Sequence, residues 1–266
     1  MVMGFVFEGV GISDKGMVRE KNEDSGILSK NLLAVADGLG GHSGGEIASR
    51  LAVLEVLEHF ALRKDSDNKD LESKGLDSNW QNNKTNDSDT KFDLENSAIA
   101  LISNINTKIR THSDTNPKLT GMGTTLSLIA IVNDIFQIIH VGDCRIYLIR
   151  KNKIQQLTHD HTVVQELLDQ GRISSDEVHA HPARSMLTKA ILGEDEVQPA
   201  TTEISVKAGD VILVASDGLT SVLSEIEIKK LIDPKNLTLG LTQLSAEINK
   251  RGAPDNFTIL LAQVVS

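Results

Sequence analysis

The chain has 266 residues, 39% of them hydrophobic and 24% charged, which is an ordinary composition for a globular protein with enough material for a core. Its formal net charge of −10 argues against nucleic acid or an anionic membrane surface as the main partner. A single cysteine, Cys144, excludes an intramolecular disulfide and disfavours a zinc site built on cysteines.

The N-terminal stretch does not resemble a targeting segment. MVMGFVFEGVG carries an acid at Glu8 and no basic residue precedes Lys15, unlike a signal peptide. No apolar run approaches the roughly 20 residues of a membrane span. We therefore expect a cytoplasmic protein that binds neither nucleic acid nor membrane.

Several short runs predict buried strands because of their length and their content of β-branched residues. In chain order they are 32–36, 126–132, 135–141, 145–149, 211–215 and 257–265. The links NDI and GDC within 126–149 are too short for parallel crossovers, so they favour an antiparallel meander.

Two stretches with helical periodicity separate the first of these runs from the second. The stretch 46–62 places on one face Ile47, Leu51, Leu54 and Leu57. The stretch 97–112 places on one face Ala98, Ile102, Ile105 and Ile109. Further helices are predicted at 162–171, stopped by Gly171, at 224–232, capped by Ser224, and at 238–252. Strands with helices between and after them predict a sheet core flanked by helices.

Residues 63–96 differ from the rest of the chain. Large apolar residues are few there, among many Asn, Ser, Asp and Lys residues. Such a segment cannot bury enough apolar surface to offset the entropy lost on ordering. We predict a single domain, 1–266, with a flexible polar insertion at 63–96 that is either loop padding or a segment for a partner or regulator.

The glycine-rich stretch LLAVADGLGGHSGG, 32–45, admits two interpretations. Within it, GHSGG at 41–45 matches the G-x-S-x-G pattern of serine hydrolases, with Ser43 as the nucleophile. Against this, DGLG separates the pattern from the preceding strand, and no histidine follows His181 to complete a triad in the usual order. A serine esterase is therefore the weaker alternative.

The second interpretation rests on aspartates at the ends of predicted strands. Asp37 and Asp217 each follow an apolar run and precede a glycine, Asp143 follows another run, and Asp255 precedes the last one. A single Asp-Gly after a strand is commonly only a turn. Strand ends on one rim of a sheet converge, however, and clustered carboxylates repel unless cations neutralise them. Oxygen ligands without a His or Cys cluster favour Mg²⁺ or Mn²⁺, and the Gly38 carbonyl could add a ligand beside Asp37.

Upstream residues fit the same centre. The stretch GMVREKNEDSGIL supplies Arg19, whose fork of donors suits a phosphate monoester. A surface salt bridge with Glu20, Glu23 or Asp24 is an equally good interpretation of this arginine. Glu23 and Asp24 could hold metal-bound water.

Ordered motifs along the chain resemble a known family. REKNEDS, VADGLGGHSGGEIAS, GMGTTL, HVGDCRIY, LTHDH, LVASDGL and APDNFT occur in the order and spacing of the metal-dependent Ser/Thr protein phosphatases of type 2C. The DGLGGH form resembles the bacterial members. The resemblance runs from about Gly11 to Val264 and leaves out only 63–96.

The resemblance implies an α+β fold, a four-layer α/β/β/α sandwich in which helices flank two antiparallel β-sheets. It implies two Mn²⁺ or Mg²⁺ ions at one end of the sandwich and a third, weaker ion in bacterial relatives. The residues that would hold the first two ions are Asp37, the Gly38 carbonyl, Asp217 and Asp255. Asp143 would bind the third ion together with Asp217. Arg19 would bind phosphate, and Glu23 and Asp24 would hold metal-bound water.

The resemblance also implies a flap beside the site, at residues 152–192. The polar residues of this flap that could contact substrate are His159, His161 and Ser185. Alternatively, these side chains belong to a solvated face.

The identity of the general acid is open. In the eukaryotic branch of the family, a histidine that directly follows the Asp-Gly is the proposed acid. Here Leu39 stands at that position and His42 lies three residues further on. Either His42 or a metal-bound water would protonate the leaving group.

The implied function is Mn²⁺- or Mg²⁺-dependent hydrolysis of phosphoserine and phosphothreonine in proteins by an activated water. No phosphoenzyme would form, so neither Ser43 nor Cys144 would act as a nucleophile. The expected partners are phosphorylated proteins and a cognate protein kinase, in signal transduction. Beside the esterase, a catalytically inert phosphatase-like binding module is the other alternative, and the complete set of acids argues against it.

Overall fold

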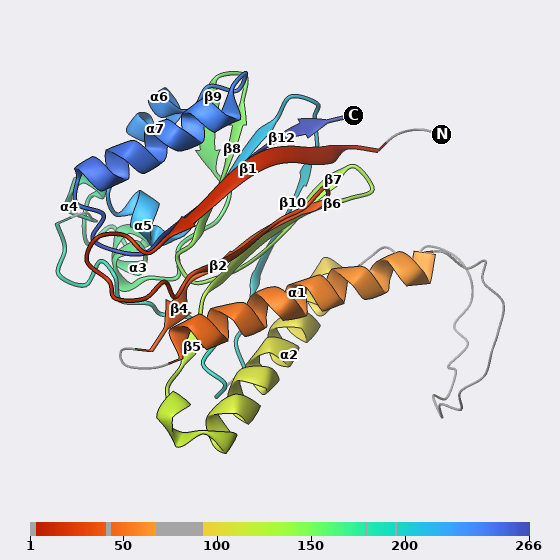
Figure 1. Ribbon diagram of the computed structural model, residues 1–266, viewed down its shortest axis with the longest axis vertical. Coiled ribbons are helices and arrows are strands. Elements are labelled where there is room, and N and C mark those ends of the chain that lie inside the picture. Colours follow the sequence, from red (N-terminus) through yellow and green to blue (C-terminus); the bar gives the residue numbers. More distant parts are fainter. Residues whose placement is uncertain (1–3, 41–43, 68–92, 179, 195) are drawn as a thin grey trace.

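The computed structural model describes residues 4–40, 44–67, 93–178, 180–194 and 196–266. Two five-stranded antiparallel sheets pack face to face, and helices cover both outer faces (Figure 1). This arrangement confirms the predicted four-layer α/β/β/α sandwich. No helix in these ranges is long and apolar enough to cross a membrane.

The first sheet has the strand order β1-β12-β11-β8-β9. Its strands are β1 (Val6–Asp14), β8 (Arg145–Arg150), β9 (Lys153–Gln156), β11 (Val211–Ala215) and β12 (Phe257–Val265). The second sheet has the order β10-β7-β6-β3-β2. Its strands are β2 (Ser25–Leu28), β3 (Leu32–Ala36), β6 (Leu126–Val132), β7 (Ile135–Val141) and β10 (Ala200–Ser205). A short pair, β4 (Gly38–Leu39) and β5 (Gly123–Thr124), extends beyond β3 and β6.

The strands predicted from apolar runs are all present, but one predicted connection is wrong. The NDI link forms a hairpin between β6 and β7, with Asn133 and Asp134 at φ values of 50° and 60°. The GDC link does not continue the meander, because β7 belongs to the second sheet and β8 to the first. The chain changes sheet at Asp143, which therefore lies at the rim of the sandwich.

Helices α1 (Gly45–Asp67) and α2 (Leu94–Thr115) cover the second sheet, and α6 (Glu225–Leu231) and α7 (Leu237–Lys250) cover the first. The predicted cap is confirmed, because the Ser224 amide donates to the Glu227 carboxylate at 2.9 Å in a capping box at the start of α6. Helix α1 extends to Asp67, five residues into the predicted insertion. Most of that insertion, 68–92, lies outside the described residues.

The predicted apolar face of α2 is confirmed, but that of α1 is only half right: Ile47 and Leu51 pack against the core, and Leu54 and Leu57 do not. Leu54 and Leu57 are 44% and 43% exposed. The small residues Ala48 and Ala52 are fully buried instead, together with Val56. Apolar residues occur nearly all round α1, so the helical period alone did not determine the buried side. Small residues let the helix approach the second sheet and α2 closely.

Buried side chains form three layers, one between the sheets and one under each helix pair. Strand β3 shows why the sandwich follows from the sequence. Its residues Leu33 and Val35 face the other sheet, whereas Leu32, Ala34 and Ala36 face the helices. Because alternate residues point to opposite faces, a strand buried on both faces must be apolar throughout.

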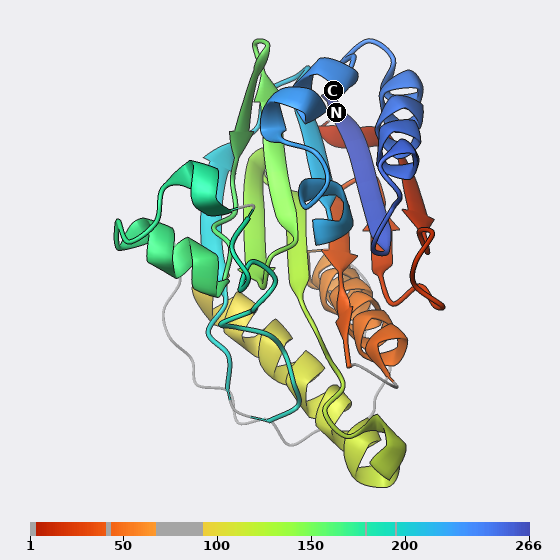
Figure 2. The same ribbon diagram turned by 90° about the vertical axis from the view of Figure 1, so that its left-hand side faces the viewer.

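β1 begins and β12 ends at one end of the sandwich, and β4 lies at the other with α3 (Val163–Asp169) and α4 (Ser175–Val178) (Figure 1). The first residues of the predicted flap form β9, and the next part carries these two short helices. Figure 2 shows both helices projecting from one side of the sandwich. The same end carries the candidate site.

Candidate metal centre

Strand register brings three of the predicted acids to one rim of the first sheet. Ala215, the last residue of β11, pairs with Ile259 of β12 on one side and with Arg145 of β8 on the other. Asp217 follows β11, while Asp255 and Asp143 precede β12 and β8. Because all these pairings are antiparallel, the end of β11 meets the beginnings of its two neighbours.

The second sheet contributes Asp37, which follows β3. Its backbone is held by the motif GMGTTL. The Asp37 amide donates to the Thr125 hydroxyl at 3.0 Å, and the Thr125 amide donates to the Asp37 carbonyl at 2.9 Å. The Thr124 hydroxyl donates to the same carbonyl at 2.9 Å. The backbone of Asp37 is therefore fixed by Thr124 of β5 and by Thr125, the residue between β5 and β6.

The glycines after the aspartates allow backbones to cross. A Cβ at Gly38 would lie 2.2 Å from the Gly45 carbonyl oxygen and 2.5 Å from that of Glu23. A Cβ at Gly218 would lie 1.9 Å from the carbonyl oxygen of Asn256. No side chain fits at either place, which explains the repeated Asp-Gly of the sequence more fully than a turn preference does.

The pKa values of the clustered acids are raised. Burial raises the pKa of Asp37 well above its usual value, and repulsion from Asp24, Asp217 and Asp143 adds to this. Burial, followed by repulsion from Asp143, raises the pKa of Asp217 to about 8. Burial, followed by repulsion from Asp160, raises the pKa of Asp143 to about 7. The positively charged side chains of the protein therefore do not neutralise the cluster of acids.

Asp24 belongs to the cluster and is 8% exposed. Its Oδ2 accepts a hydrogen bond of 2.7 Å from the Ser216 hydroxyl. Its Oδ1 is buried and has no hydrogen-bond partner among the described residues. Burial raises the pKa of Asp24 to about 6, although the bond from Ser216 lowers it in part. A buried oxygen without a partner is costly unless water or a cation meets it.

Glu23 lies beside the Gly38 backbone. Its carbonyl accepts a hydrogen bond of 3.1 Å from the Gly38 amide, and its carboxylate packs against Gly45. Burial and then repulsion from Glu46 raise the pKa of Glu23. Glu23 and Asp24, predicted to lie near the metal ligands, are thus both brought to the cluster.

Arg19 pairs with none of the acids near it in sequence. Its Nη2 donates to the Asp255 carboxylate at 2.6 Å, and the two side chains are 55% and 30% exposed. This hydrogen bond raises the pKa of Arg19, and the charges of Asp217 and Asp37 act in the same direction. The expected alternative, a local surface salt bridge, is therefore wrong, because the guanidinium faces the acid cluster.

Asn256 holds the loop that carries Arg19. Its side-chain amide donates to the carbonyls of Lys15 and Lys21, at 2.8 Å each, and its oxygen accepts from the Glu23 amide at 2.9 Å. These bonds join the loop to the residue that follows Asp255. They position an exposed arginine at the rim of the cluster.

A cleft separates the acid cluster from the flap. It is lined by Asp143 and Asp217 on one side and by flap residues that include Thr162 and Ser185 on the other. The imidazole of His159 points elsewhere, since its Nε2 lies 2.7 Å from the exposed Asp169. The imidazole of His161 accepts a hydrogen bond from the Gly142 amide at 3.0 Å. Of the predicted substrate contacts, only Ser185 lines this cleft.

The donor set fits hard divalent cations with water among their ligands. Within the described ranges, no three His, Cys, Asp or Glu side chains alone form a site that would hold an ion. Several carboxylates nevertheless gather there with raised pKa values, beside the partnerless Oδ1 of Asp24. Mg²⁺ and its analogues usually keep several waters and take few protein ligands, all oxygens, so this arrangement suits them.

Two predicted features cannot be located. His42, the candidate general acid, and Ser43, the nucleophile of the esterase alternative, lie outside the described residues. Cys144, by contrast, is fully buried, and its Sγ lies 3.1 Å from the Thr125 hydroxyl. Burial raises the pKa of its thiol well above the usual value, which agrees with the expectation that it is no nucleophile.

Comparison with known proteins identifies the family. The model of the family described as protein phosphatase 2C matches residues 20–253. The chain belongs to the protein phosphatase 2C family. The match includes the predicted metal ligands Asp37, Gly38, Asp143 and Asp217, whereas Arg19 lies directly before it and Asp255 two residues after it.

Relatives in this family come from several bacteria. The serine/threonine protein phosphatase PstP of Mycobacterium tuberculosis is 38% identical over 253 residues, which are 95% of this chain and 44% of the relative. The chain thus spans less than half the length of that protein. The serine/threonine phosphatase stp of Listeria monocytogenes is 31% identical over 257 residues, which are 94% of this chain and 93% of the relative.

Solved structures of protein phosphatase 2C relatives share the whole architecture. The crystal structure of the M. tuberculosis phosphatase PstP/Ppp has a TM-score of 0.81 and 33% identity, covering 97% of this chain and 98% of that one. The catalytic domain of PstP in complex with two manganese ions has a TM-score of 0.79 and 32% identity, and the likeness covers 98% of this chain and 100% of that one. These likenesses confirm the predicted fold.

Three polar residues of this protein phosphatase 2C site were not singled out by sequence reasoning. Thr125 holds the Asp37 backbone, Ser216 holds Asp24, and Asn256 holds the Arg19 loop. Each lies inside a motif of the resemblance, and Ser216 and Asn256 directly adjoin a predicted metal ligand. A search for hydroxyl and amide residues next to the ligands would have found two of them.

Proposed function

We propose that the chain is a Mn²⁺- or Mg²⁺-dependent phosphatase that hydrolyses phosphoserine and phosphothreonine in proteins. One observation carries the proposal: acids with raised pKa values gather around a buried oxygen that lacks a partner, and an arginine faces them. Family membership and the two manganese ions of the PstP catalytic domain support the same assignment.

The proposed ligands are the predicted ones. Asp37, the Gly38 carbonyl, Asp217 and Asp255 would hold two ions, and Asp143 would join Asp217 at a third. When bound, such ions lower the pKa of a coordinated water and polarise phosphoryl oxygens. Asp24, through its partnerless Oδ1, and Glu23 would accept hydrogen bonds from water held at the centre and so orient it.

Arg19 would bind the phosphate. Its guanidinium is more than half exposed at the rim of the cluster, and only Nη2 donates to a described residue. The remaining N–H donors are available for phosphate oxygens, which a planar fork matches well. Arg19 would also stabilise the charge that develops on these oxygens during hydrolysis.

The leaving serine or threonine oxygen needs a proton. His42 or a water would supply it, and neither Ser43 nor Cys144 would form a covalent intermediate. The substrates would be phosphorylated proteins, and the enzyme would counteract a cognate protein kinase in signal transduction. The name protein phosphatase, borne by the PstP relative, supports this substrate class.

One set of assays tests the proposal against its alternatives. Hydrolysis of p-nitrophenyl phosphate, of phosphoserine and phosphothreonine peptides, and of p-nitrophenyl acetate would be measured with Mn²⁺ and with EDTA. We expect turnover of the phosphate substrates that EDTA abolishes and that Asp217→Asn reduces strongly in a folded protein. Acetate turnover that resists EDTA and is lost in Ser43→Ala would instead establish the esterase. A folded protein without either activity would be the inert module.

A further inference from the structure

The turn that carries Asp143 is held by side chains on both sides. Before it, the Gly142 amide donates to Nδ1 of His161 at 3.0 Å, and the His161 amide donates back to the Gly142 carbonyl at 2.8 Å. After it, the Ser127 hydroxyl donates to the Cys144 carbonyl at 2.6 Å. The chain therefore has little freedom to move at Asp143, where it passes from one sheet to the other.

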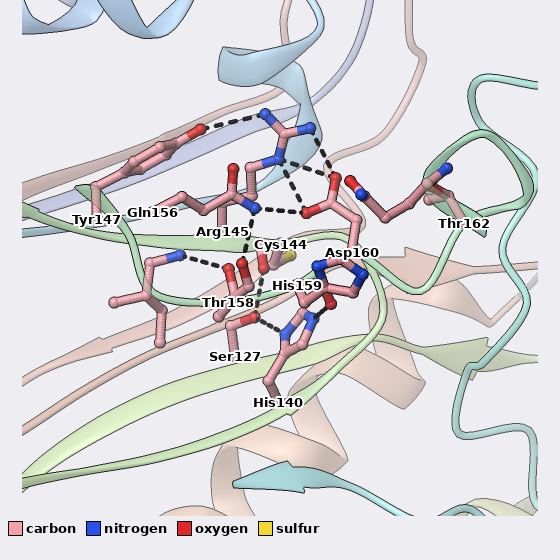
Figure 3. Close-up of polar contacts among 12 residues, drawn as sticks. Ser127, His140, Cys144, Arg145, Tyr147, Gln156, Thr158, His159, Asp160 and Thr162 are labelled. Atoms are coloured by element: carbon pink, nitrogen blue, oxygen red, sulfur yellow. Dashed lines mark hydrogen bonds and ion pairs between the residues drawn. The ribbon is translucent and has the colours of Figure 1, made fainter. Parts of the chain in front are cut away.

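Arg145, two residues after Asp143, makes the strongest of these contacts. Its Nε and Nη2 bind the Asp160 carboxylate as a fork, at distances from 2.7 to 3.0 Å, and its Nη1 donates to the Tyr147 hydroxyl at 3.2 Å (Figure 3). Gln156 donates to Asp160 as well, at 2.9 Å. The Asp160 side chain is only 6% exposed, so solvent screens the pair weakly.

Asp160 and His161 both belong to residues 159–162, which we call the flap base. The same segment carries the flap on its other side. The hydroxyl of Thr162 caps α3, and the carbonyl of His161 accepts from the Thr188 amide at 2.8 Å. Toward the second sheet, the His159 carbonyl lies 3.1 Å from Nε2 of the buried His140 in β7. The four residues of the flap base thus contact both the turn of Asp143 and the flap helix α3.

We infer that Asp160 and His161 are positioning residues that hold the turn of Asp143 and so couple the placement of the flap to the acid cluster. The inference deepens the proposed function and rests on it. In this role Asp160 acts through Arg145 and His161 acts through Gly142, although the Asp160 side chain also lines the cleft. They act through Asp143, whose carboxylate lines the cleft opposite the flap.

The same strand provides a matched control. Arg150, at the other end of β8, pairs with Asp210, and its side chain is 23% exposed against 22% for Arg145. Asp210 is 2% exposed, and its pair also forms a fork. Both pairs therefore resemble each other in chemistry and burial, but only the Asp160 pair lies at the flap.

The test compares Asp160→Asn with Asp210→Asn by amide hydrogen exchange and by calorimetric titration with Mn²⁺. We expect Asp160→Asn to speed exchange in α3 by about 10-fold or more and to weaken Mn²⁺ binding by a similar factor. Asp210→Asn should change the exchange rate in α3 and the Mn²⁺ affinity by less than about twofold each, even if it lowers the melting temperature as much as Asp160→Asn does. Equal effects of the two variants would overturn the inference.

A second comparison asks whether Asp160 acts through Asp143. In an Asp143→Asn background, Asp160→Asn should weaken Mn²⁺ binding no further, because the residue that it positions is already gone. Full additivity of the two changes would contradict the inference. If Asp160→Asn does not fold, His161→Ala serves in both comparisons, since it removes one acceptor and leaves no buried charge unpaired.

These measurements do not depend on turnover. Exchange and Mn²⁺ binding can support the coupling even if no phosphate ester is hydrolysed, in which case only the proposed function fails. If the wild type is active, Asp160→Asn should lower kcat and leave KM nearly unchanged, and Asp160→Glu should restore part of the loss. A loss of activity that merely follows the melting temperature across all variants would indicate a structural role alone.

Discussion

Asp37 and Thr125 hold each other through reciprocal hydrogen bonds. The Asp37 amide donates to the Thr125 hydroxyl at 3.0 Å, and the Thr125 amide donates to the Asp37 carbonyl at 2.9 Å. Both residues are at the ends of neighbouring strands of the second sheet, β3 and β6. The orientation of the central acid of the proposed centre therefore depends on a threonine hydroxyl that no ligand would touch.

Replacing Thr125 by valine tests this dependence. The change keeps the shape but removes the acceptor of the Asp37 amide, so Mn²⁺ affinity should fall about 10-fold to 100-fold. The buried amide left without a partner should cost about 1–3 kcal/mol of stability. Calorimetric titration and thermal unfolding measure the two effects. Thr125→Ser keeps the hydroxyl and is the control; if it weakens Mn²⁺ binding as much as valine does, the hydrogen bond is not the cause.

Removing one acid should stabilise the metal-free protein. In Asp217→Asn one of the mutually repelling carboxylates is lost, so the melting temperature in EDTA should rise above that of the wild type. Mn²⁺ should raise the melting temperature of the wild type by binding the folded state alone, and should have much less effect on the variant. Differential scanning calorimetry in EDTA and in Mn²⁺ provides both values. A variant that is less stable in EDTA would argue against a repulsive cluster.

Stability of the metal-free protein should fall as the pH rises from about 6.5 to 8.5. The folded-state pKa values of Asp24, Asp143 and Asp217 are raised to about 6, 7 and 8. The folded protein then binds more protons than the unfolded one in this window, so unfolding becomes easier as the protons leave. His140, whose pKa burial and His161 lower to about 3, opposes this trend only at more acidic pH, where an unfolded histidine is protonated.

Urea unfolding in EDTA across this pH range measures the trend. Saturating Mn²⁺ should reverse or flatten it, because the bound cations favour the ionised carboxylates. Asp143→Asn is the control, since it should reduce the slope without Mn²⁺ by removing one titrating group. A stability in EDTA that is independent of pH would show that these acids are ionised in the folded protein throughout.

Arg19 should affect binding of the phosphate more than stability. Arg19→Lys keeps the charge but loses the planar fork, so KM for a phosphopeptide should rise about 10-fold with a smaller change in kcat. Because the side chain is 55% exposed, the melting temperature in Mn²⁺ should change little. Lys21→Arg, a change at a nearby exposed cation, is the control. An unchanged KM for Arg19→Lys would mean that Arg19 only neutralises Asp255.

The sequence predicted correctly those elements whose residue pattern fits only one kind of structure. Strands such as β3 are buried on both faces, so their apolar runs predicted them directly. The edge strands β1 and β2 were missed, because glycine and polar residues interrupt their patterns. The predicted face of α1 was right for Ile47 and Leu51 but wrong for Leu54 and Leu57, because apolar residues nearly surround that helix and only the packing against α2 and the sheet selects a side.

By itself the sequence determined the set of acids at strand ends, the ordered motifs of the family and hence the sandwich of two sheets. The tertiary structure alone decided that Arg19 faces Asp255, which is 236 residues away in the chain. It also decided that the chain changes sheet at Asp143 and that Arg145, two residues later, pairs with Asp160. The physical reason is the same in each case. Local patterns record which residues are buried. Pairing across strands and sheets depends on register, and register is set jointly by contacts between residues that lie far apart in the sequence.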